Sequence, residues 1–293
     1  MATANEPQQQ QPAPASAPVP AVAAAPKFVF SGGVACNTAA EFAQLRRELR
    51  QYGLENLKAE LVAAGWFERD EAAAASSAES AAAGKLRIAT GVKPFNPFAR
   101  IVSGQLAVPY GNHLQRLGMQ AEDTKFFVAQ NRPEFDEHWA SAEPEWIGKA
   151  SMAQRHQFLL LRSLHWGTFN AATFGLDYED GADPVAQIAS LREALTLVDE
   201  SERVAREYAR RADWGSNIGL YVHVYPLNSV QAFHLHVLDD DTRGPTFDKL
   251  NHKNLPLQAV REVLQQEIAE LEQQQPQSGE SAPSVQPQGQ QPQ

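Results

Sequence analysis

The segment Ala232–Val237 (AFHLHV) places two histidines two residues apart in a strand-like context. Because alternate side chains of a β-strand lie on the same face, His234 and His236 project together, while their apolar neighbours face the other way. A neutral imidazole acts as a nucleophile, a proton carrier or a metal ligand near pH 7. The spacing therefore predicts an apolar strand face for the core and an opposite face that offers two imidazoles to a site.

Two other interpretations of this pair remain open. An HxH pair on one strand face also holds zinc or iron in some enzymes, which would need a third ligand, with His223 or His156 as the candidates, and a nearby carboxylate. No glutamate is spaced to serve on the same strand, so we expect no stoichiometric metal and no cofactor. The second interpretation is a solvated strand face with incidental histidines.

The sequence around the pair, NSVQAFHLHVLD (228–239), resembles the signature of the histidine triad (HIT) superfamily of nucleotide hydrolases and transferases. That signature has a Ser or Thr and a Val, then alternating histidines and apolar residues. Ser229 and Val230 match it, as does the run 234–238 (HLHVL). Ala232 stands where the family has the first histidine of its triad. The resemblance is therefore to a HIT-like domain with an incomplete triad.

Two upstream blocks are similar to the family in the same order. NPFARIVSGQLAVP (96–109) resembles its opening segment, and RHQFLLLRSLH (155–165) resembles its second strand, without the usual proline and with the second histidine one residue late. In one branch of the superfamily a His-x-x-Pro pair precedes the signature, and His223 with Pro226 has that spacing. The resemblance covers residues 95–272 and implies an α+β fold.

The resemblance also implies a mechanism. His234 would attack the α-phosphate of a nucleotide and form a nucleotidyl-histidine that water then hydrolyses. A backbone carbonyl commonly holds the proton on the other ring nitrogen of such a nucleophile. His236 would donate to a phosphate oxygen in the transition state. Ser229 and the backbone around Asn228 would bind the phosphate, and His156 would contact the phosphate or the leaving group.

Asn131 lies about where the family places an acidic residue for the ribose hydroxyls. Because Ala232 removes a partner of the nucleophile and leaves His234 itself in place, we expect a nucleotide hydrolase or nucleotidyltransferase. The alternative is a HIT-like module that binds nucleotides without turnover. The expected partner is a nucleotide or nucleotide conjugate, such as a dinucleoside polyphosphate, a phosphoramidate, an adenylated amino acid or a capped nucleotide. A homodimer is compatible with the resemblance.

The elements that must position these residues follow from periodicity. Alternation and apolar runs predict strands at 125–130, 156–161, 217–227 and 230–239. Helical spacing of apolar residues predicts helical structure at 184–211, as one helix or as two shorter ones joined at 199–201. It also predicts a helix at 257–271 and two more within 39–64 that Gly53 separates. His113, His138 and His252 lie in polar contexts and are expected on the surface.

The amino-acid composition of the 293-residue chain limits the partners and compartments that we expect for it. Its formal net charge of −10 argues against long nucleic-acid partners, which require a basic surface, and no apolar run is long enough to span a membrane. The single cysteine, Cys36, excludes an intramolecular disulfide and a Cys-rich zinc site. No secretory signal is evident, which favours the cytoplasm or nucleus.

Low-complexity stretches divide the chain. Residues 1–26 and 273–293 are rich in Ala, Pro and Gln and are expected to be disordered tails. A helical N-terminal extension at 27–69 and a linker or insertion at 70–94 are expected to precede the HIT-like domain at 95–272.

Overall fold

The computed structural model describes residues 27–69, 86–91, 93–108, 110–119, 125–176, 178 and 182–274. Within them the chain has an α+β fold, as the sequence predicted. The helices are α1 (Ala39–Tyr52), α2 (Leu54–Ala63), α4 (Pro97–Val102), α5 (His113–Arg116), α6 (Pro133–Glu137), α7 (Pro184–Arg211), α8 (Pro245–Leu250) and α9 (Leu257–Gln274). The strands are β1 (Phe67–Arg69), β2 (Leu86–Ile88), β3 (Phe126–Gln130), β4 (His156–Leu161), β5 (Ile218–Val222), β6 (His234–Asp239) and β7 (Leu255–Pro256).

The larger sheet is antiparallel and has the strand order β3-β4-β6-β5-β7. In the β4–β6 pair, His156 lies opposite Leu238 and Phe158 lies opposite His236. Directly opposed residues of an antiparallel pair share a face of the sheet. The register therefore confirms that one sheet carries both His156 and His234, and it places them on the same face as His236.

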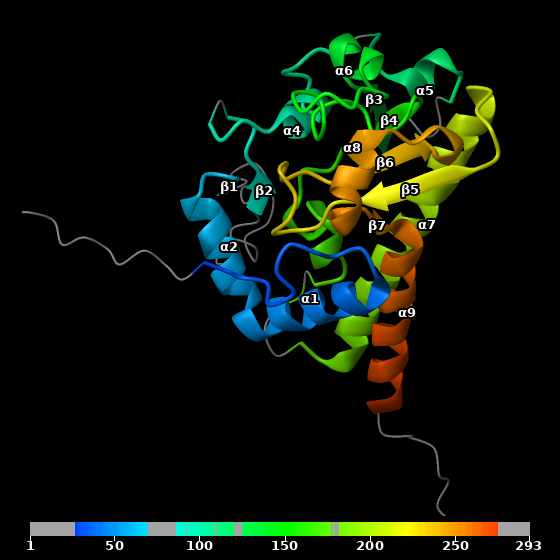
Figure 1. Cartoon of the computed structure of the whole chain (residues 1–293). Helices are drawn as coiled ribbons and strands as arrows, with labels where there is room; N and C mark the ends of the chain where they lie inside the picture. Colours follow the sequence, from blue (N-terminus) through cyan, green and yellow to red (C-terminus); the bar gives the residue numbers. More distant parts are fainter. Residues whose placement is uncertain are drawn as a thin grey trace, which may run out of the picture.

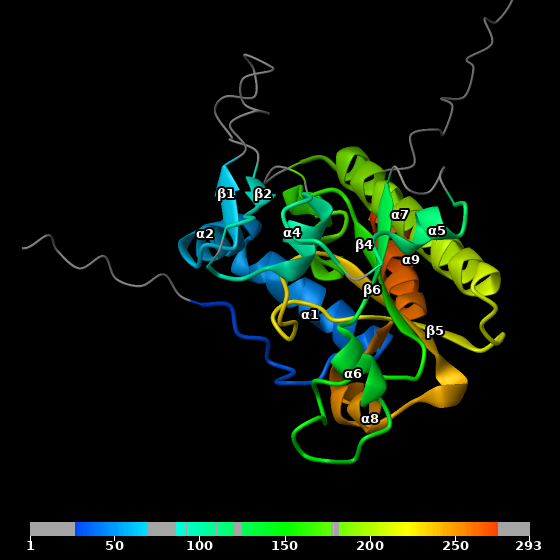
Figure 2. The same cartoon turned by 90° about the horizontal axis from the view of Figure 1, so that it is seen from above.

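The other face of this sheet packs against α7 and α9 (Figure 2). Leu235 and Val237 of β6 and Leu220 and Val222 of β5 point into that core, which also contains the buried stripes of both helices. Helices α4, α6 and α8 lie on the opposite side of the strands in the same view. The alternation along β6 thus puts its apolar residues under the long helices and its histidines under the short ones.

The N-terminal helices belong to the same core. Thr38 and Glu41 form a reciprocal capping box that starts α1, and Gly53, with a φ of 91°, ends it. Leu45 and Leu49 of α1 lie in the same buried cluster as the apolar stripes of α7 and α9. Helix α1 crosses beside α9 near the lower end of the sheet (Figure 1).

Three boundaries differ by more than one residue from the predicted ones. Strand β5 ends at Val222, because the following residues form a turn that Asn170 fixes by accepting from the backbone N–H of Tyr225. Strand β6 begins only at His234. Helix α9 continues two residues into the expected C-terminal tail, next to the ion pair between Arg192 and Glu272.

Parts of the expected organisation lie outside the described residues, namely the tails at 1–26 and 275–293 and the stretch 70–85. Within the expected linker at 70–94, Leu86–Ile88 forms β2, which pairs with β1. Among the helices that the structure describes, none is both long enough and apolar enough to cross a membrane.

Candidate active site

Three segments bring four histidines together on the sheet face opposite α7 and α9. They are His156 on β4, His234 and His236 on β6, and His223 just after β5, and we call them the histidine cluster. The ring centroid of His236 lies 5.2 Å from that of His156, 4.3 Å from that of His223 and 5.0 Å from that of His234. His236 is therefore the central member.

Apolar side chains flank the cluster and shield it from solvent. One buried group contains Ile101, Ala129, Phe158 and Leu160, and another contains Met152, Ala153, Tyr221, Leu238 and Phe247. The ring centroid of Phe98 on α4 lies 4.6 Å from that of His234, and the centroid of Phe158 lies 5.2 Å from that of His236. In such surroundings a donor aimed at developing charge is more effective than it would be in water.

Burial keeps every imidazole of the cluster neutral at neutral pH. It lowers the pKa of His156 to about 3, with a further contribution from the repulsion between the protonated forms of His156 and His234. It lowers the pKa of His223 to about 3 and that of His234 to about 4, and the nearby positive charge of Lys253 adds to both shifts. The pKa of His236 lies well below its ordinary value, first through burial and then through repulsion from its neighbours.

A backbone carbonyl fixes the tautomer of His234. Its Nδ1 lies 2.7 Å from the carbonyl oxygen of Ala232, which can only accept a hydrogen bond. The proton of the neutral ring is therefore on Nδ1, and Nε2 carries the free lone pair. This is the protonation state that a nucleophilic imidazole requires.

A relay through His156 fixes the tautomer of His236. The backbone N–H of Met152 donates to Nδ1 of His156 over 3.2 Å, so the neutral ring of His156 carries its proton on Nε2. That proton is donated to Nδ1 of His236, 3.0 Å away. His236 must then carry its own proton on Nε2. This atom is buried and has no hydrogen-bond partner among the described residues, so it is a donor without an acceptor.

His223 is oriented by the last strand of the sheet. The amide nitrogen of Asn254 donates to the carbonyl of Phe247 over 3.4 Å, so its Oδ1 is the acceptor for Nε2 of His223 at 2.8 Å. The lone pair of His223 is accordingly on Nδ1. Because Asn254 directly precedes β7, the polar groups form a row that crosses the sheet from β4 to β7.

The low pKa values predict acid sensitivity. Below about pH 6.5 the unfolded chain protonates His156, His223 and His234, whereas the folded chain does not until about pH 3–4. The unfolded state then binds more protons, so the free energy of unfolding falls as pH falls, by about 1.4 kcal/mol per pH unit for each histidine. Urea unfolding between about pH 6.5 and 4.5 should show this slope.

A matched pair of variants tests the cause of that slope. His223→Gln should reduce the slope of the free energy of unfolding against pH by the share of one histidine, about 1.4 kcal/mol per pH unit. His252→Gln, at an exposed histidine, should leave the slope unchanged. Equal slopes in the wild type and His223→Gln would show that His223 is not held neutral by the fold.

Three further predicted site residues, Asn228, Ser229 and Asn131, are not members of the histidine cluster. Asn228 is buried, and its amide donates to the carbonyl of Val230 over 2.6 Å, so it holds the loop before β6. Ser229 in the same loop is exposed and makes no side-chain hydrogen bond with the described residues. Asn131 donates to the hydroxyl of Ser151 over 2.8 Å, one residue before the Met152 that binds His156.

Sequence reasoning missed several residues of the site or misplaced them. Asn96 is fully buried, caps α4 and donates to the carbonyl of Gln231 over 3.0 Å, which ties Phe98 to the loop before β6. An Asn directly before a Pro at a helix start is a recognisable cap, so this signal was present. His113 was expected on the surface, which is wrong, because it packs in the core with its Nδ1 3.3 Å from the hydroxyl of Tyr208.

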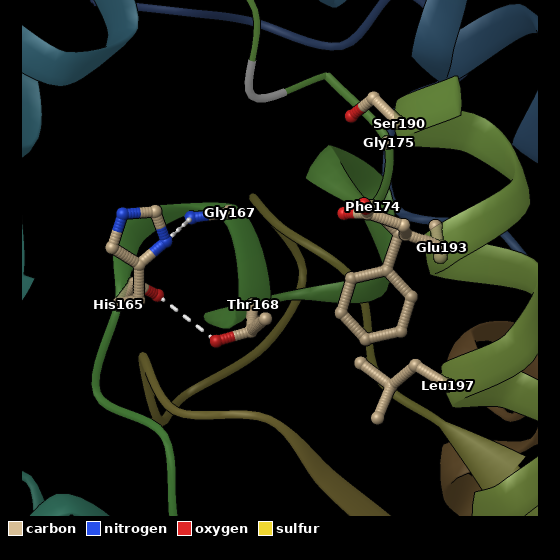
Figure 3. Close-up of a pocket in the computed structure, with 9 residues that line it drawn as sticks. His165, Gly167, Thr168, Phe174, Gly175, Ser190, Glu193 and Leu197 are labelled. Atoms are coloured by element: carbon tan, nitrogen blue, oxygen red, sulfur yellow. Dashed lines mark hydrogen bonds between the residues drawn. The ribbon is translucent and has the colours of Figure 1, made fainter. Parts of the chain in front are cut away.

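A separate pocket of about 290 Å³ lies beside α7 (Figure 3). Its lining consists of His165, Gly167, Thr168, Phe174, Gly175, Ser190, Glu193, Ala194 and Leu197. His165 belongs to this pocket and not to the histidine cluster, and its Nδ1 accepts from the backbone N–H of Gly167 over 3.2 Å. The second histidine of the upstream sequence block therefore caps a local turn.

No protein-family model matches the chain. No curated protein matches it either.

Proposed function

We propose that the protein binds a nucleotide or nucleotide conjugate at the histidine cluster and attacks its α-phosphate with Nε2 of His234, as a hydrolase or nucleotidyltransferase of HIT type. The observation that carries this proposal is the opposite protonation of two neighbouring rings. His234 presents a lone pair, whereas His236 presents an N–H donor for which the described part of the chain supplies no acceptor. A nucleophile beside a free donor suits attack on phosphorus, where negative charge develops on the non-bridging oxygens.

The chemical steps use these two rings. A bond forms between Nε2 of His234 and the α-phosphorus while the bond from phosphorus to the leaving group breaks, and the leaving group takes the electron pair. The leaving atom is an oxygen in a polyphosphate and a nitrogen in a phosphoramidate, where it also takes up a proton from solvent. The carbonyl of Ala232 accepts from Nδ1–H and stabilises the positive charge that grows on the ring. Water then attacks phosphorus, the P–N bond breaks, its electron pair returns to Nε2, and the water proton is released. His236 donates to a non-bridging oxygen in both steps.

Ala232 is compatible with this scheme. The backbone carbonyl at this position holds the Nδ1 proton of His234, and that contact does not depend on the side chain. The incomplete triad therefore leaves the nucleophile in its reactive tautomer.

A panel of nucleotide substrates tests the proposal. Dinucleoside polyphosphates, nucleoside phosphoramidates, adenylated amino acids and capped nucleotides all present an α-phosphate, and release of nucleotide from each is measured for wild type and His234→Ala. We expect turnover of at least one substrate by the wild type only. A wild type that binds nucleotides and turns over none would favour the non-catalytic module.

The second candidate function is metal binding. The ligand nitrogens of His223, His234 and His236 all lie within 4.8 Å of one another, which is the arrangement of a three-histidine site. The hydrogen bonds oppose it, because a metal on Nε2 of His236 needs that nitrogen unprotonated. The tautomer of His156 would then have to reverse against the N–H of Met152.

Replacing His156 separates the two functions. In His156→Phe, Nδ1 of His236 loses its donor, so His236 is free to expose a lone pair at Nε2. We expect turnover to fall about tenfold or more and zinc affinity to rise, as measured by kinetics and by metal analysis after equilibration with zinc. The metal function predicts instead one zinc per wild-type chain, which is lost in His236→Ala because that variant removes a ligand.

A further inference from the structure

The loop between β3 and β4 closes on itself directly before the histidine cluster. It leaves β3, passes through α6 and returns to β4. Ser151, which is fully buried near the end of this loop, donates its backbone N–H to the carbonyl of Phe135 over 2.9 Å. Its hydroxyl contacts Asp136 on α6 and Asn131 directly after β3. Ser151 therefore ties the end of the loop to its beginning.

The direction of each side-chain bond in this closure is fixed. A carboxylate only accepts hydrogen bonds, so the hydroxyl of Ser151 donates its proton to Asp136. A lone pair of the same hydroxyl accepts from Nδ2 of Asn131 over 2.8 Å. The hydroxyl is thus held from two sides, and we call Asp136, Ser151 and Asn131 the serine clamp.

The peptide bond that follows Ser151 sets the protonation of the cluster. The N–H of this peptide belongs to Met152 and donates to Nδ1 of His156 over 3.2 Å. The carbonyl of Met152 accepts from the backbone N–H of Gly244 over 2.9 Å, which holds the other side of the residue. The N–H and the C=O of a planar trans peptide point in opposite directions. Turning the peptide over would therefore bring the carbonyl of Ser151 toward His156 in place of the N–H.

Such a turn would reverse both protons of the relay. A carbonyl only accepts, so His156 would hold its proton on Nδ1 and would accept at Nε2 from Nδ1 of His236. His236 would then carry a lone pair on Nε2 in place of the N–H. With His223 and His234, that lone pair would complete a three-histidine arrangement that suits a metal. The orientation of one peptide thus decides whether His236 is a hydrogen-bond donor or a ligand.

We propose that the serine clamp holds the following peptide with its N–H on His156 and thereby keeps His236 a donor. The three members of the clamp are positioning residues, because they act on His236 only through this peptide and His156. In this role Asn131 holds the loop, in place of the ribose contact that the resemblance implies. The effect of the clamp on turnover rests on the proposed function, whereas its effect on the proton of His236 does not.

NMR of the histidine rings in the full chain tests the clamp. Long-range proton–nitrogen correlations show which ring nitrogen of His236 carries the proton in the wild type and in Ser151→Ala. The wild type should show the proton on Nε2, and the variant should gain a population with the proton on Nδ1. Asp136→Ala removes the acceptor of the hydroxyl at a half-buried position and should act in the same direction. It supplies the readout if Ser151→Ala does not fold.

Thr246→Val is the matched control. The hydroxyl of Thr246 binds the same loop, because it accepts from the backbone N–H of Gly148 over 3.1 Å, three residues before Ser151. This variant should keep the proton positions of the wild type. Metal analysis after equilibration with zinc should show an affinity about tenfold or more higher in the two clamp variants and unchanged in Thr246→Val. Where the wild type hydrolyses a nucleotide, kcat should fall about tenfold in the clamp variants while KM changes little.

Three results would overturn the role of the clamp. They are wild-type proton positions in both clamp variants, an equal change in Thr246→Val, and a wild-type His236 that carries its proton on Nδ1. If the wild type turns over no nucleotide, the proposed function fails, and the ring spectra still decide whether the clamp sets the proton of His236.

Discussion

His234→Ala and His234→Asn are expected to remove turnover by several orders of magnitude while nucleotide affinity changes little. The reason is that Nε2 of His234 forms the bond to phosphorus, and its lone pair lies in the same cluster as the N–H donor of His236 that has no acceptor among the described residues. Single-turnover kinetics and equilibrium binding of the same nucleotide separate the two effects. An acid-labile P–N adduct trapped on His234 during turnover would identify the intermediate directly.

Two further variants provide comparisons for the loss of turnover in His234→Ala. His236→Ala removes one donor to the transition state and should lower the rate by about 10²–10³. Ala232→His restores the side chain of a full triad and keeps the carbonyl that binds His234, so turnover should stay similar or rise. Wild-type hydrolysis by His234→Ala would refute the mechanism.

The largest expected effect on stability is at Arg46, whose side chain is fully buried. Its guanidinium donates to Glu267 through two bonds of 2.9 and 2.7 Å and to the carbonyls of Ala172 and Phe174. Arg46→Met leaves both carbonyls without this donor and removes one of the cations that offset the buried carboxylate. Breaking such a pair costs about 3–5 kcal/mol, which urea unfolding at constant m-value would measure.

Arg50→Met is the matched control, because Arg50 binds the same carboxylate one turn later and keeps about a third of its side chain exposed. Its loss should be about 1 kcal/mol. Equal losses for the two variants would show that Arg46 does not act as a buried link. The contact joins α1 to α9, so its strength also determines how firmly the N-terminal helices belong to the core that supports the sheet.

Local signals made several elements predictable from the sequence. Helix α7 has the predicted bounds, because Asp183 caps it, Pro184 occupies its first turn and one apolar stripe runs through it. Strand β4 also has the predicted bounds. The segment 223–233 was predicted mostly as strand, because its apolar residues alternate. A contact from Asn170, more than fifty positions earlier, bends its first part into a turn.

The sequence by itself determined the α+β class, the main helices and the shared face of His234 and His236, because these depend on periods of 3.6 and 2 residues. Only the tertiary structure decided which partners complete the cluster. The register of β4 against β6 brings in His156, and Asn254 before β7 orients His223. Proton positions on imidazoles follow from such distant donors and acceptors, and spacing along the chain carries no information about them.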